Sequence, residues 1–159
     1  MKKLITLMVL MFIIPACGSE DPAISDATKE NSLEVHYSTS NFQSSVVSDR
    51  EVDLSNQDKL LAFIEKESDA LTIIHHLKEQ DPVLSRVKMS ESDHTYIYEV
   101  NKGLSPIPKG TYTCSKSPSL SGHMLMLEQC KNEENEKFFS LPLIPLTENA
   151  IATIENKVS

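Results

Sequence analysis

An apolar run near the start of the chain decides how much of it can belong to a folded domain. Lys2 and Lys3 precede an apolar run over residues 4–14, which Thr6 interrupts and Pro15 ends. A basic end followed by a short apolar stretch is typical of a signal peptide. A helix that crosses a bilayer needs about 20 apolar residues, so this run is too short to remain as an anchor. We therefore predict a removable leader over residues 1–16.

The end of this run carries a four-residue motif. Ile14, Pro15, Ala16 and Cys17 resemble the lipobox of bacterial lipoproteins, in which a branched apolar residue and two small residues precede the lipidated cysteine. Pro15 departs from the small residue usual at its position. The resemblance implies cleavage before Cys17 and attachment to the membrane through acyl chains on this cysteine. Each buried methylene group of these chains contributes about 0.8 kcal/mol to membrane binding. The alternative is an ordinary secretory signal cut near Ala16, which would leave Cys17 as an unpaired thiol.

The residues after Cys17 bear on location. Lipoproteins with an aspartate directly after the cysteine tend to stay in the inner membrane, whereas Gly18 and Ser19 follow here. The resemblance thus implies an outer-membrane lipoprotein whose domain faces the periplasm; the outer face of the inner membrane and the cell surface are the alternatives. Residues 18–32 are polar and lack an apolar pattern, which favours a flexible tether. The expected organisation is a signal peptide over 1–16, a lipidated tether over 17–32, and one domain over 33–159.

The charge of the chain limits its partners. The whole sequence has 15 basic and 23 acidic residues, and loss of Lys2 and Lys3 leaves 13 basic ones (15 minus 2), a net charge of about -10. Such a domain repels nucleic acid and anionic lipid head groups. The balance favours solubility or a basic protein partner.

The first part of the expected domain has a mixed pattern. Leu33, Val35 and Tyr37 alternate with polar residues as in a half-buried strand. Residues 38–45 are typical of a loop around Phe42, and a second short strand is expected at residues 46–47.

A helical repeat follows from about Asn56 to Gln80. Ser55 and Asp58 have the spacing of a capping box, and apolar residues recur on one side of the helix; these are Leu60, Leu61, Ile64, Leu71 and Ile74. Polar residues at 67–68 leave open a bend or a break into two helices. Pro82 ends the element, since a residue before proline avoids helical geometry. On such a helix His75 and His76 cannot both face one metal ion.

After Pro82 the pattern alternates. A turn at residues 92–93 would place Val87 opposite Tyr98, Met89 opposite Tyr96, and Arg86 opposite Glu99. This register predicts a hairpin with one apolar face and one face that carries a charge pair. Residues 101–110 contain two prolines and two glycines and are expected to form a loop.

The lipobox resemblance makes the remaining cysteines informative. With Cys17 lipidated in an oxidising compartment, Cys114 and Cys130 are the remaining thiols, and a disulfide is the expected state. A hairpin with residues 121–123 as its loop and Gly122 at its centre places Cys114 opposite Cys130 and Lys116 opposite Glu128. We interpret this disulfide as structural, because redox pairs are normally close in sequence.

The last part of the chain completes the expected fold. Apolar residues at 138–144 indicate a strand limited by Pro142 and Pro145, which suits a sheet edge. Residues 147–158 fit a short helix or a strand. The expected class is α+β: a small antiparallel sheet of three to five strands with one amphipathic helix packed on one face.

Catalytic and cofactor signatures are missing from the sequence. None of its five histidines belongs to a closely spaced zinc motif, so no metal site and no cofactor are expected. There is no G-x-S-x-G motif and no uncommitted thiol for nucleophilic catalysis. We therefore expect a protein that is not an enzyme.

Two functions fit these features. The first is a non-catalytic module, anchored to the membrane through Cys17, that binds or helps to assemble another envelope protein. The second is an inhibitor or immunity lipoprotein that blocks a secreted or periplasmic hydrolase. Residues 112–114 (Tyr-Thr-Cys) and the Ser121-Gly122 step resemble pieces of the bacterial lysozyme-inhibitor lipoproteins, whose binding loop contains Ser-Gly. The resemblance implies a binding site at Ser121, Gly122 and His123. The expected helix and the absence of aromatic residues after the Ser-Gly step depart from that family.

Overall fold

One mixed β-sheet dominates the chain. The computed structural model describes residues 26–40, 52–90, 94–104 and 107–158. In these ranges the strands follow the order β2-β1-β3-β4-β5-β6-β8-β7, and β9 pairs with β8. The elements are α1 (Asp26–Glu30), β1 (Leu33–Tyr37), β2 (Val52–Ser55), α2 (Gln57–Ile64), β3 (Ala70–His76), β4 (Val83–Met89), β5 (Tyr96–Val100), β6 (Gly110–Cys114), β7 (Ser119–Ser121), β8 (Met124–Asn132), β9 (Asn135–Pro145) and α3 (Glu148–Val158).

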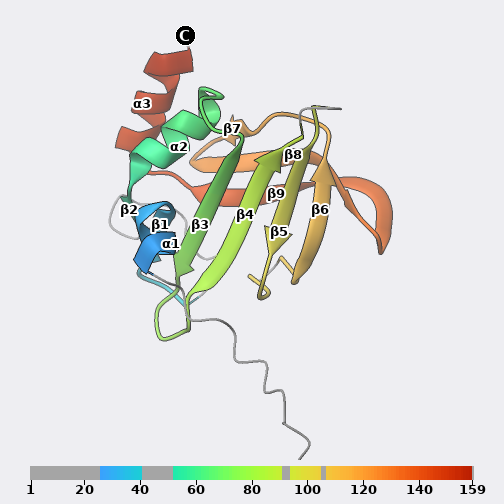
Figure 1. Cartoon of the computed structure of the whole chain (residues 1–159), viewed down its shortest axis with the longest axis horizontal. Helices are drawn as coiled ribbons and strands as arrows, with labels where there is room; N and C mark the ends of the chain where they lie inside the picture. Colours follow the sequence, from blue (N-terminus) through green and yellow to red (C-terminus); the bar gives the residue numbers. More distant parts are fainter. Residues whose placement is uncertain (1–25, 41–51, 91–93, 105–106, 159) are drawn as a thin grey trace, which may run out of the picture.

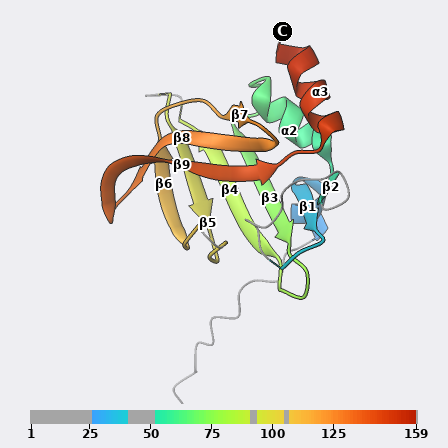
Figure 2. The ribbon, with the colours of Figure 1, turned by 180° about the vertical axis from the view of Figure 1, so that it is seen from behind.

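The sheet curls over on itself. Strands β3 to β6 lie side by side, and β8 and β9 cross them at a steep angle on one face (Figures 1 and 2). The α2 and α3 helices lie together at one end, and α1 lies beside β1 on the opposite face from β8 and β9 (Figure 1). The core fills the inside of this half-barrel, because alternate residues of each strand point inward. Fully buried examples are Val35, Ile73, Val87, Tyr98 and Leu127.

The expected fold class was wrong in both sheet size and helix content. The described chain has nine strands rather than three to five, and β1 pairs with β3 in parallel. Its three helices are short, the longest having 11 residues. The predicted number of strands is too low because residues 70–76 form a strand and not part of a helix, and because several strands have only three to five residues.

The predicted break near residue 67 is present, but a strand follows it. The α2 helix ends at Ile64, and Lys66 has a positive φ of 60°. The β3 strand then begins at Ala70, so the predicted helix over 56–80 was wrong beyond its first part. Leu71 and Ile74 suited a helical repeat, but they lie on opposite faces of β3, and both are buried. Buried apolar residues on both faces interrupt the alternation that identifies a half-buried strand.

The start of α2 also differs from the prediction. Ser55 belongs to β2, and Asn56 is the N-cap residue in a left-handed conformation, without a side-chain cap bond. The Asn56 amide donates instead to the carbonyls of Ser32 at 3.0 Å and Lys29 at 3.3 Å. Asn56 therefore joins the start of α2 to the segment before β1.

The end of the segment expected to be a tether is structured. Residues 26–30 form α1, and Ser32 is fully buried. The predicted strand at 33–37 is confirmed as β1. The expected loop is described only over residues 38–40, and the expected strand at 46–47 lies outside the described residues.

The predicted hairpin register is confirmed. Val87 pairs with Tyr98, Met89 with Tyr96, and Arg86 with Glu99, while the expected turn at 92–93 lies outside the described residues. The expected loop over 101–110 holds an isolated bridge between Leu104 and Ile107, and both side chains are buried. This loop thus contributes to the core.

The two cysteines are joined across neighbouring strands. Cys114 of β6 pairs with Cys130 of β8 and forms a disulfide with it, as predicted. The amine of Lys116 lies 3.5 Å from the Glu128 carboxylate, which agrees with the predicted alignment. The turn has two residues, not three, because Ser121 pairs directly with Met124. Ser119 pairs with Met126, and Cys114 pairs with Cys130. Between these two pairs the first segment has four residues (115–118) and the second has three (127–129), so the pairing shifts by one residue.

The last strand and helix close the half-barrel. The β9 strand pairs with β8, and in the described residues its other edge has no strand partner, in line with the prediction. Residues 148–158 form α3, which settles the choice between helix and strand. The Thr147 hydroxyl accepts from the Ala150 amide at 3.2 Å, as expected of a helix N-cap. An ion pair of 3.0 Å joins Lys157 of α3 to Glu65 after α2.

Replacing both Cys114 and Cys130 with serine tests the contribution of this cross-link. Closure of a loop of about 15 residues is worth about 3 kcal/mol in the chain-entropy model, so urea unfolding should show a loss of about 2 to 4 kcal/mol. Reduction of the wild-type protein should give a similar loss. Free thiols at both positions in the native protein, detected by mass mapping, would contradict the pairing.

Candidate functional site

The residues predicted from sequence do not form one site. Cys17 lies outside the described residues. All three residues are exposed: Ser121 ends β7, and Gly122 and His123 form the two-residue turn to β8, where Gly122 has a positive φ of 58°. A Cβ atom at Gly122 would meet no heavy atom within 4 Å, so glycine is required there by backbone conformation and not by a close approach. The turn therefore has a structural explanation.

A cluster that the sequence analysis did not predict lies on the outer face of β1 and β3. It consists of Glu34 and His36 of β1 and His76 of β3. Glu34 and His36 are two residues apart and so share one face of their strand. The parallel register places His36 directly beside His76. This pairing brings together residues that are 40 positions apart in the chain (76 minus 36).

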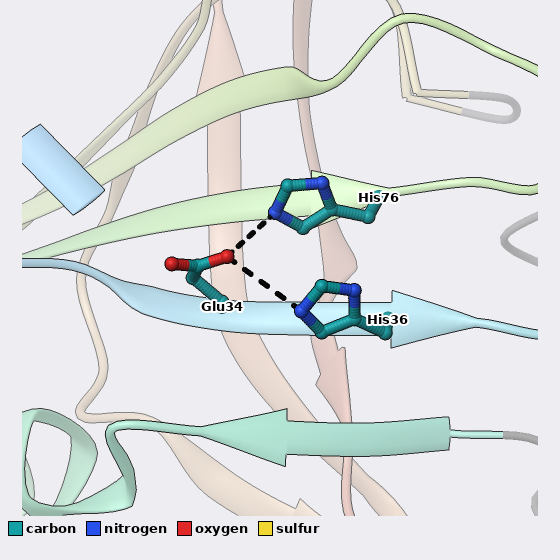
Figure 3. A group of neighbouring side chains, drawn as sticks. All are labelled: Glu34, His36 and His76. Atoms are coloured by element: carbon teal, nitrogen blue, oxygen red, sulfur yellow. Dashed lines mark hydrogen bonds and ion pairs between the residues drawn. The ribbon is translucent and has the colours of Figure 1, made fainter. Parts of the chain in front are cut away.

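The three side chains meet at one carboxylate oxygen (Figure 3). His76 Nε2 donates to Glu34 Oε2 at 2.9 Å, and His36 Nε2 lies 3.6 Å from the same oxygen. The imidazole rings of His36 and His76 stack with centroids 4.3 Å apart and planes 3° apart. One potential ligand atom from each of the three side chains lies within 4.8 Å of the other two.

The surroundings set the charge of this cluster. Burial, followed by the neighbouring His36, lowers the pKa of His76, although the hydrogen bond that His76 donates to Glu34 opposes the shift. The side chains of Glu34 and His76 are 19% and 24% exposed, whereas that of His36 is 45% exposed. One side of the cluster therefore faces solvent. An imidazole that is neutral near pH 7 and a carboxylate are both suited to hold a divalent cation.

Two further charged residues lie close to the cluster. Asp53 of β2 pairs with His36 across the strands, so the two side chains share the outer face. Lys29 of α1 contributes to the lowered pKa of His76, although less than any other group. An acidic residue on β2 and a basic residue on α1 are thus neighbours of the cluster.

The expectation of no metal site came from the lack of a closely spaced ligand motif, and placing His75 and His76 in a helix gave no reason to look for ligands on neighbouring strands. With β3 assigned correctly, the Glu-x-His spacing at 34–36 was the available signal, because it puts two ligand types on one face of a strand. The neighbouring strand could not be identified from spacing. The pairing of β1 with β3 therefore had to come from the tertiary structure.

A second polar group lies on the inner side of the same strands. The His75 imidazole joins the Tyr37 hydroxyl and the Ser85 hydroxyl through hydrogen bonds of 2.9 Å each. His75, Ser85 and Tyr37 are 0%, 1% and 5% exposed. A serine beside a histidine can act as a nucleophile, but these three side chains are buried in the core of the described residues. We interpret these three side chains as a buried network whose members satisfy one another's hydrogen bonds.

Burial determines the protonation of this network. Burial first, and then the neighbouring His76, lower the pKa of His75 to about 3. Burial raises the pKa of Tyr98 to about 12, although the neighbouring Ser85 hydroxyl opposes this shift. The buried Tyr98 hydroxyl does not meet the geometry of a hydrogen bond. All these groups are therefore neutral near pH 7.

A hollow of about 790 Å³ lies where β6 begins and β8 ends. Its lining combines Phe138 with the basic residues Lys109 and Lys131 and the acidic residues Glu133 and Glu134. Phe138 is 64% exposed, and among the described residues no other large apolar side chain is exposed to this extent. Its neighbour Phe139 points to the other face and packs edge-on against Tyr112.

Comparisons with known proteins do not identify a family. No protein-family model, curated protein or solved structure matches the chain. In the part of the chain that the structure describes, no helix is long and apolar enough to cross a bilayer.

The buried His75 predicts that acid destabilises the protein. In the unfolded chain His75 takes up a proton near pH 6.5, whereas in the folded protein its pKa is about 3. As the pH falls between these values, the unfolded state gains a proton that the folded state does not bind. The free energy of unfolding should therefore decrease by up to about 1.4 kcal/mol per pH unit from this group.

Urea unfolding between pH 7 and pH 4 measures this decrease. A His75→Gln variant keeps a polar group that does not titrate in this range, so its stability should depend less on pH. Equal pH dependence in the two proteins would show that His75 is not the responsible group.

Proposed function

We propose that the chain is a lipoprotein, anchored through Cys17, whose domain binds another envelope protein without catalysing a reaction. The lipobox at residues 14–17 supports the anchor. The net charge of about -10, from 13 basic (15 minus 2) and 23 acidic residues, supports a partner with a basic surface.

The observation that carries the binding proposal is the position of Phe138. Partner-binding surfaces commonly centre on an aromatic side chain with a polar and charged rim. Phe138 is 64% exposed beside a hollow that Lys131 and Glu134 also line. The β8 and β9 strands project past β6 at this end of the molecule (Figure 1). Most residues that line the hollow are exposed. The proposed partner contacts Phe138, and its basic surface is attracted by the acidic domain.

The anchor is tested by a Cys17→Ser variant. Lipidation requires the cysteine thiol, so the variant should leave the membrane fraction or stay unprocessed, while the wild type stays in the membrane fraction. Intact mass should show acyl chains on residue 17 of the mature wild-type protein. An unmodified residue 17 would contradict the proposed anchor.

The binding surface is tested by a photo-crosslinking amino acid at position 138 in cells of the native host. Arg86, exposed on β4 and remote in sequence from the hollow, is the matched control position. We expect a discrete crosslinked product from position 138 and none from position 86. Mass spectrometry then identifies the partner.

The identified partner is retested as a purified protein. A Phe138→Ala variant should bind it at least about fivefold more weakly, since truncation of a central aromatic residue costs more than about 1 kcal/mol. Because Phe138 is exposed, the melting temperature should not change. Undiminished binding by the variant, or equal crosslinking from position 86, would contradict this surface. A basic hydrolase that loses activity in the complex would identify the protein as an inhibitor.

A further inference from the structure

We propose that Glu34, His36 and His76 form a binding site for a divalent transition-metal ion of the zinc and copper type. The proposal is independent of the partner surface at Phe138. It rests on three potential ligand atoms that lie within 4.8 Å of one another, supplied by two paired strands.

The distances in the cluster suit a shared ion. Ligands that hold zinc at about 2.1 Å in a tetrahedron lie about 3.4 Å from one another. Glu34 Oε2 lies 2.9 Å from His76 Nε2 and 3.6 Å from His36 Nε2. These two separations lie on either side of the tetrahedral value. The three ligands are therefore close enough to share one ion after their side chains readjust.

Ion binding has a definite effect on the two rings. An imidazole binds a metal with a lone pair in the plane of the ring, whereas His36 and His76 are stacked in planes 3° apart. At least one ring must rotate for both nitrogen atoms to face one ion (Figure 3). His76 Nε2 must also give up the proton that it donates to Glu34, and in the neutral ring this proton is then carried by Nδ1. Binding should therefore separate the stacked rings.

The ligand types indicate the class of metal. Two imidazoles and one carboxylate suit zinc, copper and nickel, whereas calcium and magnesium prefer oxygen ligands. With neutral imidazoles, Glu34 gives the cluster one negative charge. Asp53 adds a second carboxylate on the same face, and Lys29 of α1 opposes the cation.

The exposure of the site leaves room for further ligands. His36 is 45% exposed, so the cluster opens to solvent on the β1 side. Three protein ligands with an open side are the arrangement in which zinc keeps a water molecule or an outside ligand. The bound ion would thus be accessible from the surface and not sealed in the core.

Calorimetric titration of the untagged mature domain with zinc chloride tests the site. The wild type should bind a single ion per chain, and His36→Gln, His76→Gln and Glu34→Gln should each weaken binding by more than about tenfold. His94→Gln and His123→Gln are the matched controls, because they remove exposed histidines outside the cluster. Magnesium chloride should give no binding at the same concentrations. Circular dichroism establishes that each variant is folded.

A second measurement does not depend on the variants. Zinc should shift the imidazole proton and nitrogen resonances of His36 and His76 in the wild-type protein and leave those of His94 and His123 unchanged. Cobalt in place of zinc should give the visible absorption of a low-coordinate nitrogen and oxygen site. Absence of zinc binding, equal binding by the cluster and control variants, or binding that persists in Glu34→Gln would overturn the three-ligand site.

Discussion

The parallel pairing of β1 with β3 organises both polar clusters of this protein. Because side chains alternate across a strand, neighbouring histidines of β3 point to opposite faces of the sheet. His75 joins Tyr37 and Ser85 in the core, and His76 joins Glu34 on the surface. One strand register thus positions a buried neutral network and an exposed set of potential metal ligands. A shift of β1 by one residue would exchange its inner and outer faces and disrupt both.

The curl of the sheet provides the core that this register requires. Strands β8 and β9 cross the inner face of β3 to β6, so residues such as Leu127 and Val87 are fully buried (Figure 2). The disulfide between Cys114 and Cys130 joins β6 to β8, where the sheet changes direction. The same region bears Phe138 on its outer side. The proposed partner surface and the proposed metal site therefore occupy separate parts of the sheet, at β9 and at β1.

The sequence predicted best those elements whose pairing is local. The hairpin that pairs Val87 with Tyr98 follows from alternation over neighbouring segments. The pairing of Cys114 with Cys130 was predicted correctly, although the turn is one residue shorter than expected and a one-residue register shift compensates for the difference. Prediction failed for β3, where apolar residues on both faces hide the period of a strand. The same error concealed the candidate site, since a histidine assigned to a helix could not be placed beside Glu34.

By itself, the sequence determined an acidic domain, a lipobox-like motif at Cys17, the strand at 33–37 and the cross-link between two nearby strands. Each depends on composition or on contacts between segments close along the chain. The tertiary structure alone decided that β1 lies beside β3, that β9 crosses the sheet, and that Glu34, His36 and His76 meet. These arrangements join distant segments, and their partners are selected by burial and hydrogen bonding across the whole sheet. The spacing of residues along the chain does not show which distant segments pair.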